Sequence, residues 1–291
     1  MATGGQPAAA EEVASGERFA FGRNWQHFVT HLDEARIQDA VSSLSTFLGV
    51  TSLSEKSFLD AGSGSGLMSL AAQRLGAHPI ASFDYDLDSV ACTRRVRDDS
   101  HADENEWTVT QGSLLDDAFL STLGQFDVVY CWGVAHHTGA MWESLTNLMQ
   151  AVRPGGRMGV AVYNDQGWRS ATWRRVKRAY VRGGVITRGL LVAASAPFIY
   201  VPAVARASAR AIGRLTPGDR APRVVRPSGT RGMSRWHDLI DWVGGYPFEY
   251  AHPDDVVRFY GDHGFDVESL ETCGKGLGCN QFLMRRAPEG A

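Results

Sequence analysis

Short apolar segments alternate with helix-like segments through the middle of the chain, and this alternation constrains the fold more than any other feature. The segments with strand character cover residues 57–60, 80–83, 107–111, 126–132 and 157–163. Helix-like segments over residues 67–75, 87–96 and 142–152 lie between them, the last closed by Pro154-Gly155-Gly156. Such alternation is typical of a mainly parallel, doubly wound sheet with helices on both faces. A helix over residues 253–263 and two closing strands, 267–271 and 281–285, are expected near the end.

The composition is that of an ordinary folded protein. Of 291 residues, 44% are hydrophobic and 21% charged, which excludes a largely disordered, collagen-like or coiled-coil chain. The four cysteines form no CxxC pair, so we expect reduced thiols and a cytoplasmic protein. Residues 1–16 have neither a basic start nor an apolar stretch, so we expect a disordered tail and no signal peptide. Residues 17–49 carry a helical stripe after a short aromatic lead-in over residues 19–25.

Charge is distributed unevenly along the chain. Residues 165–235 contain fifteen Lys and Arg against two acids, whereas the rest has 14 basic and 30 acidic residues, a net charge of −16. Within this basic segment, residues 189–205 are uncharged, but the stretch is only 17 residues long and contains Pro197 and Pro202. That is short for a membrane span, so we expect an apolar lid or docking helix. The basic segment fits a solvated helical cover, an anion pocket under an apolar lid, or a surface for nucleic acid or membrane.

A glycine loop follows the first apolar strand, in Asp60-Ala-Gly62-Ser-Gly64-Ser-Gly66. Glycines let a backbone turn tightly and approach a ligand, and the helix that follows offers free N–H groups. The spacing is GxGxG and not GxGxxG, and an acid precedes it. This acid would repel a pyrophosphate but could hold an ammonium group. A tight strand-to-helix turn without a ligand is the alternative interpretation.

Asp84 closes the second strand, in Ser82-Phe-Asp84-Tyr-Asp86. A carboxylate at this place in a nucleotide-binding α/β fold can accept both hydroxyls of a ribose. Capping of the helix that begins at Leu87 is the alternative role for an acid here, and it suits Asp86 or Asp88 better than Asp84.

Together these segments resemble the class I S-adenosylmethionine-dependent methyltransferases, strongly over residues 55–164 and more weakly over residues 250–286. The glycine loop is similar to the first motif of that family, and Asp84 matches its ribose-binding acid. Gln111-Gly112-Ser113 matches the adenine-side segment, where many members have an acid in place of Ser113.

Later segments resemble the same family. Residues 126–137, ending in His136-His137, are similar to its fourth motif, and Arg153-Pro-Gly-Gly-Arg157 resembles the turn before its fifth strand. Residues 21–25 and 278–280 are similar to a small-molecule subgroup of bacterial biosynthetic enzymes. The resemblance implies a Rossmann-like, seven-stranded sheet and S-adenosyl-L-methionine as cofactor. The cofactor-binding residues it implies are Trp25, Asp60, Gly62, Ser63, Gly64, Gly66, Asp84, Tyr85, Gly112, Ser113 and Cys131.

Methyl transfer from a sulfonium is an in-line displacement, so the protein must hold the nucleophile near the methyl group and deprotonate it where needed. Candidates follow the fourth and fifth strands, where ligands of open α/β sheets bind. We expect the base among His137, Tyr163, Asp165 and Glu249. Contacts to the acceptor are expected from His136, Trp168, Arg174, Arg178 and Tyr246. The histidines show no metal-ligand spacing, so we expect no metal site, and Mg²⁺ only with an acceptor phosphate.

The expected organisation is a disordered tail (1–16), a helical cap (17–54), a cofactor-binding core (55–164), a mainly helical insertion after strand five (165–249) and closing elements of the core (250–291). The expected function is methylation of a small molecule in specialised metabolism, at O, N or C. An acceptor with an anionic group and a hydrophobic body, such as a prenyl diphosphate, fits the insertion. An RNA methyltransferase and a non-catalytic partner subunit are the alternatives. We expect no transmembrane segment, and a homo-oligomer is left open.

Overall fold

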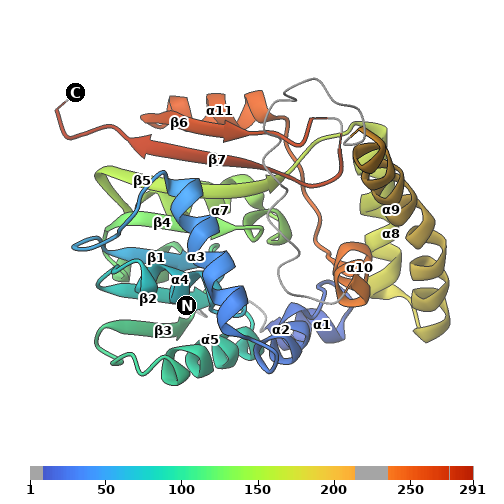
Figure 1. Cartoon of the computed structure of the whole chain (residues 1–291), viewed down its shortest axis with the longest axis horizontal. Coiled ribbons are helices and arrows are strands. Elements are labelled where there is room, and N and C mark those ends of the chain that lie inside the picture. The colour runs from blue at the N-terminus through green and yellow to red at the C-terminus, as the bar shows by residue number, and fades with distance from the viewer. Residues whose placement is uncertain (1–8, 214–234, 275, 291) are drawn as a thin grey trace, which may run out of the picture.

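A seven-stranded sheet forms the centre of the computed structural model, which describes residues 9–213, 235–274 and 276–290 (Figure 1). The strand order is β3-β2-β1-β4-β5-β7-β6. The strands are β1 (Phe58–Ala61), β2 (Ile80–Asp84), β3 (Trp107–Gln111), β4 (Phe126–Trp132), β5 (Val152–Tyr163), β6 (Phe265–Glu271) and β7 (Cys279–Arg286). Strands β1 to β5 pair in parallel, and β7 runs antiparallel to both β5 and β6. The predicted doubly wound, mostly parallel sheet is confirmed.

Side chains point alternately to the two faces of the sheet along each strand, and both faces are buried. In β1, Phe58 joins the apolar cluster on one face, whereas Leu59 and Ala61 join the cluster on the other. The first face is covered by α3 (Glu34–Leu48), α4 (Leu67–Arg74) and α5 (Leu87–Asp99). The second face is covered by α6 (Asp117–Thr122), α7 (Met141–Met149) and α11 (Pro253–Asp262). A 3-10 turn, η1 (Ala135–His137), follows β4.

The N-terminal region differs from the sequence-based expectation in two respects. Residues 9–16, expected within a disordered tail, include a short helix, α1 (Ala9–Ala14), while residues 1–8 lie outside the described part. The expected helical stretch over residues 17–49 is two helices, because α2 (Phe21–Val29) ends before α3 begins. The aromatic lead-in is therefore largely helical. Asp33 separates the two helices, since its carboxylate caps α3 by accepting from the Arg36 N–H.

The turn expected at Pro154-Gly155-Gly156 is part of a strand. Helix α7 ends at Met149, and β5 already begins at Val152. Phe126 of β4 pairs with Val152 and Val128 pairs with Arg157, so the register shifts across the Pro-Gly-Gly segment. Pro154 and the two glycines thus make an irregularity within a strand and do not end the helix.

Three helices follow β5: α8 (Trp168–Arg182), α9 (Val185–Gly213) and α10 (Arg235–Gly244). They pack on one another at one end of the molecule, beyond the carboxyl ends of the strands (Figure 1). Val192, Leu239 and Val243 form the centre of their own apolar cluster. The basic residues between 214 and 234 lie outside the described residues. Within the described part of the chain, no helix is long and apolar enough to cross a membrane.

Candidate active site

The glycine loop between β1 and α4 has the tight turn that its sequence predicts. Gly62, Gly64 and Gly66 have φ angles of +81°, +54° and +78°, which favour glycine. The N–H groups of Gly62 and Ser63 donate to the carbonyl of Phe83, which ties the loop to the end of β2. A Cβ atom on Gly64 would lie 3.0 Å from the indole nitrogen of Trp25. The Trp25 side chain of α2 therefore packs directly against the loop.

Two carboxylates lie beside this loop. Asp84 accepts hydrogen bonds from the N–H groups of Gly64 and Asp86, each at 2.9 Å. Asp60 is 3% exposed and accepts a hydrogen bond from the Ser69 hydroxyl at 2.6 Å. Burial raises the pKa of Asp60 to about 7 and that of Asp84 to about 6, and repulsion from Asp84 adds to the rise at Asp60. Negative charge is costly at both acids, so a cationic ligand fits here.

The other predicted cofactor residues surround the loop at different depths. The Ser63 hydroxyl bonds that of Thr93 at 2.9 Å, and the Gly112 N–H donates to the Asp84 carbonyl. A Cβ on Gly112 would lie 2.1 Å from the Phe119 ring, so a side chain has no room there. Ser113 accepts from the Leu115 N–H, and Cys131 lies in the core. Asp86 caps α5, as the alternative role for an acid at this position predicts.

The N-terminal segment bridges the cofactor side and the histidine pair. The Arg18 guanidinium ion-pairs with Glu12, lies 4.9 Å from the Tyr85 ring and donates to the His137 carbonyl at 2.8 Å. The Phe21 ring lies 4.8 Å from the His137 ring. Sequence reasoning missed Arg18 and Glu12, because nothing local links residues 12–18 to residues 85 and 137.

His136, His137 and Tyr163 form a compact group at the carboxyl ends of β4 and β5. The Tyr163 ring lies 4.0 Å from the His136 ring and 5.4 Å from the His137 ring. His137 Nδ1 is 2.6 Å from the Pro247 carbonyl, which can only accept, so Nδ1 carries the proton. In the neutral ring, Nε2 is then the atom that can accept a proton.

Glu249 has a structural contact that its sequence position does not reveal. Its carboxylate accepts from the N–H of Met141 at 3.0 Å, at the start of α7. Its own N–H donates to the His136 carbonyl at 2.9 Å. Burial raises the pKa of Glu249, while hydrogen bonds from the backbone oppose the rise. Glu249 therefore caps α7 from a distant segment and ties that segment to the histidine pair.

Lys177 of α8 is completely buried in an aromatic box that sequence reasoning missed. Its ammonium lies 4.7 Å from the rings of Trp242 and Phe248 and 5.6 Å from that of Tyr163, and it donates to the Trp242 carbonyl. These contacts favour a cation. They join α8, α10 and the end of β5 next to the histidine pair. Lys177 has a recognisable signal, since it is the sole lysine between residues 57 and 274.

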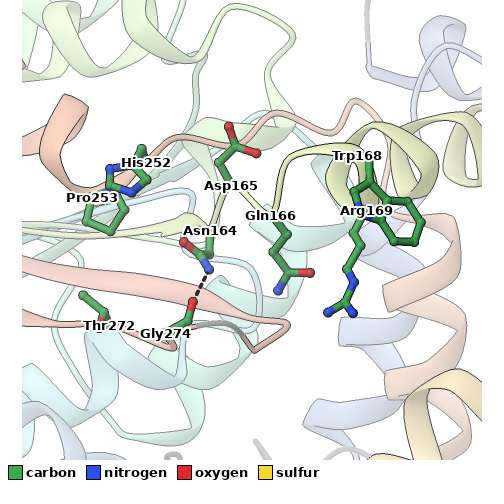
Figure 2. A pocket seen from close by; sticks show the side chains of 9 residues that line it. All are labelled: Asn164, Asp165, Gln166, Trp168, Arg169, His252, Pro253, Thr272 and Gly274. Atoms are coloured by element: carbon green, nitrogen blue, oxygen red, sulfur yellow. Dashed lines mark hydrogen bonds between the residues drawn. The ribbon is translucent and has the colours of Figure 1, made fainter.

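A cavity of about 510 Å³ lies beside the end of β5, between α8, α11 and the segment after β6 (Figure 2). It is lined by Asn164, Asp165, Gln166, Trp168, Arg169, His252, Pro253, Thr272 and Gly274. Asp165 accepts from the Gly167 N–H at 2.7 Å, and Trp168 is 75% exposed. Two predicted residues, Asp165 and Trp168, therefore share a cavity whose lining includes neither His136 nor His137.

The remaining residues predicted to contact the acceptor molecule lie on α8 and in the segment after α10. Arg174 and Arg178 are exposed on α8, and the Arg174 guanidinium lies 5.9 Å from the Tyr250 ring. The Tyr246 carbonyl accepts from the Phe19 N–H at 2.9 Å, which joins the N-terminal segment to the end of the insertion. Among the described residues, no group of three or more His, Cys, Asp or Glu is arranged to hold a metal ion.

Comparison with known proteins places this chain among methyltransferases. Residues 29–186 match the family model for a methyltransferase domain. Ribosomal protein L11 methyltransferases from Burkholderia lata and Prochlorococcus marinus are 33% and 30% identical over 106 and 105 residues. Each match covers 36% of this chain and 31% or 34% of the relative, so the chain spans about a third of the length of these relatives.

Solved structures share the fold at low identity. Magnesium protoporphyrin IX methyltransferase (ChlM) from Synechocystis PCC 6803 with bound SAM has a TM-score of 0.53 and 12% identity, covering 98% of this chain and 100% of that one. An O-methyltransferase family protein from Burkholderia thailandensis has a TM-score of 0.51 and 13% identity, covering 97% and 68%. Because the family model covers more than half of its length, this chain belongs to the methyltransferase domain family, and the predicted resemblance to class I S-adenosylmethionine-dependent methyltransferases is confirmed.

Proposed function

We propose that this protein is an S-adenosyl-L-methionine-dependent methyltransferase that acts on a small-molecule acceptor. The observation that carries the proposal is the contact between the Asp84 carboxylate and the Gly64 N–H. This contact brings an acid of the kind that binds ribose hydroxyls in α/β folds beside the glycine loop, which supports the proposal. The fit extends to charge, since Asp60 and Asp84 are buried acids with raised pKa values and the cofactor carries an ammonium and a sulfonium.

When bound, the cofactor supplies an activated methyl group, and the chain's own residues do the rest. Asp84 would accept the ribose hydroxyls, and Asp60 would hold the ammonium group of the cofactor. Trp25 and Arg18 cover this side and exclude water. Holding donor and acceptor in line accounts for much of the rate gain of such a reaction.

His137 is the residue we assign as the base. Its Nδ1 proton is held by the Pro247 carbonyl, so Nε2 would take the proton from the acceptor. The Tyr163 ring packs against the rings of both histidines and would hold their orientation. Asp165 lies in the neighbouring cavity and Glu249 caps α7, so each would need a different acceptor position to serve as base.

The acceptor we propose has an anionic group and a hydrophobic body, as a prenyl diphosphate has. Residues 166–213 contain nine cations and no acid, which favours an anion at this end of the molecule. The uncharged stretch over residues 189–205 would cover the hydrophobic body, whereas the rings of Trp242 and Phe248 already enclose Lys177. Mg²⁺ would enter only with an acceptor phosphate, and the cavity near Asp165 would take a polar part of the acceptor.

Calorimetric titration with S-adenosylhomocysteine tests the cofactor site. Asp84→Asn should raise the Kd by about 10- to 100-fold, the usual effect of losing a charged hydrogen bond. Asp33→Asn is the matched control, because Asp33 also accepts from a backbone N–H but caps α3 away from the loop. Equal Kd values for wild type and Asp84→Asn would refute the cofactor site.

Transfer of label from a methyl-labelled cofactor tests the acceptor class. The panel contains prenyl diphosphates, phenols, amines, total RNA and ribosomal protein. Label on an anionic, hydrophobic small molecule supports the proposal. Label on RNA or protein would overturn the acceptor and leave the cofactor site standing. Cofactor binding without transfer to any member would favour a non-catalytic partner subunit.

A further inference from the structure

The first half of helix α9 is largely apolar, and one side of it is exposed. No charged residue occurs between Arg188 and Arg206. Val192 packs inward against Leu239 and Val243 of α10. On the opposite side, Ile186, Leu190 and Phe198 are 80%, 66% and 72% exposed. Several large apolar side chains exposed on one side of a helix are typical of an interaction surface, so we expect this side of α9 to have a partner.

Exposed arginines lie on the neighbouring helix. Arg175, Arg178 and Arg182 of α8 recur at intervals of three and four residues, so they share one side of the helix, and all three are exposed. Helices α8 and α9 pack side by side at the end of the molecule away from the sheet (Figure 1). We call the six residues Ile186, Leu190, Phe198, Arg175, Arg178 and Arg182 the α8–α9 face.

We propose that the α8–α9 face binds the surface of an anionic lipid bilayer. An anionic bilayer has an apolar layer that can take up the exposed apolar side chains and negative headgroups that can pair with the guanidinium groups. Since no described helix can cross a membrane, the helix would lie in the interface and not span it. The acidic remainder of the chain, with a net charge of −16 outside residues 165–235, would be repelled and would point away from the lipid.

Other partners fit the same face less well. A second copy of the chain would bring arginines against arginines. A nucleic acid would satisfy the arginines but leave Ile186, Leu190 and Phe198 facing phosphates and water. The combination of apolar and basic residues therefore favours lipid over both.

Vesicle sedimentation tests the proposal with the full-length protein. We expect at least tenfold tighter binding to 3:1 phosphatidylcholine–phosphatidylglycerol vesicles than to pure phosphatidylcholine, and weaker binding at high salt. Ile186→Glu and Leu190→Glu should each weaken binding at least fivefold, as should neutralising Arg178 and Arg182 to Gln. The matched control is Leu87→Glu on α5, a leucine of similar exposure, 61%, far along the chain, which should bind as wild type does.

A conservative variant covers the case in which the charged variants fail to fold. Because the chain has eight native tryptophans, quenching by brominated lipids is compared with wild type: Phe198→Trp should increase the quenched fraction, whereas Leu87→Trp should not. Unchanged S-adenosylhomocysteine affinity serves as the folding check. Absence of binding to anionic vesicles would overturn the proposal. The proposal would also be overturned if wild type bound no lipid and formed a dimer that Leu190→Glu dissociates. RNA binding that is lost only in the arginine variants would overturn it as well.

Discussion

Replacing Asp60 with Asn should stabilise the ligand-free protein and weaken cofactor binding at the same time. Asp60 is buried, and its pKa is about 7 in the fold against an ordinary value of 3.8. The folded protein therefore keeps a proton that the unfolded chain loses. This contribution to stability is fully present below pH 3.8 and is lost progressively as the pH rises to about 7.

The size of the effect follows from the shift. A pKa unit corresponds to about 1.4 kcal/mol, so Asp60 destabilises the ligand-free protein by ~4 kcal/mol above neutral pH. Asparagine does not ionise, and its amide oxygen can still accept the Ser69 hydroxyl. For a chain of this size we expect the melting temperature of Asp60→Asn to exceed that of wild type by roughly 5–10 °C at pH 8. The gap should shrink as the pH falls toward the ordinary carboxyl range.

Thermal unfolding followed by circular dichroism, at a series of pH values without ligand, measures this gap. Asp127→Asn is the matched control with the opposite sign. Partial burial of Asp127 opposes ionisation, but hydrogen bonds from Ser57 and the charge of Arg153 lower its pKa overall. Its loss should therefore destabilise the protein at pH 8. A gap for Asp60→Asn that is negative at pH 8, or that does not change with pH, would refute the reasoning.

Substitutions at three further residues test the acceptor side. Lys177→Met should speed hydrogen exchange in α8 and α10 while S-adenosylhomocysteine affinity stays within twofold. Lys56→Met, at an exposed lysine, is the control. Unchanged hydrogen exchange in Lys177→Met would contradict the role of the aromatic box. His137→Ala should lower the methyl-transfer rate by about 10²-fold or more with cofactor affinity unchanged, and a normal rate would move the base elsewhere. Glu249→Gln should keep the cap on α7 and the turnover, whereas Glu249→Ala should cost about 1 kcal/mol in thermal unfolding; loss of turnover in Glu249→Gln alone would make Glu249 the base.

The sheet was predictable because its strands are buried on both faces. Segments such as residues 126–132 are apolar apart from Asp127 near the start of the strand, which is typical of the middle of a parallel sheet. Predictions from local sequence were less reliable at the ends of the helices and strands. Pro154-Gly-Gly favours a turn by composition, but the pairing of β4 with β5 extends the strand through it. Likewise, propensity alone gave no reason to break the helix at residues 30–33, where the Asp33 cap is the deciding contact.

The cofactor side could be predicted because its parts are local. The glycine loop and Asp84 each stand at the end of a strand, and the sheet order brings those ends together. The cover over this site could not be predicted. Arg18 reaches Tyr85 and His137 from a segment that carries no motif, and such contacts depend on how α1 and α2 pack.

On the acceptor side, the sequence drew attention to the arginines of α8 and not to Lys177. Arg174 and Arg178 stand out as charges, and both are exposed. Helical spacing instead turns Lys177 inward, on the same side as Ser170 and Val181, which are also buried. A buried position in an arginine-rich helix selects lysine for a physical reason: the compact ammonium fits between three rings and one carbonyl, whereas a guanidinium is wider and carries five donors. The exposed arginines are then free to interact with a partner, and the buried lysine fixes where the insertion sits. The charge of the insertion thus divides into two roles that its net value of +13 conceals.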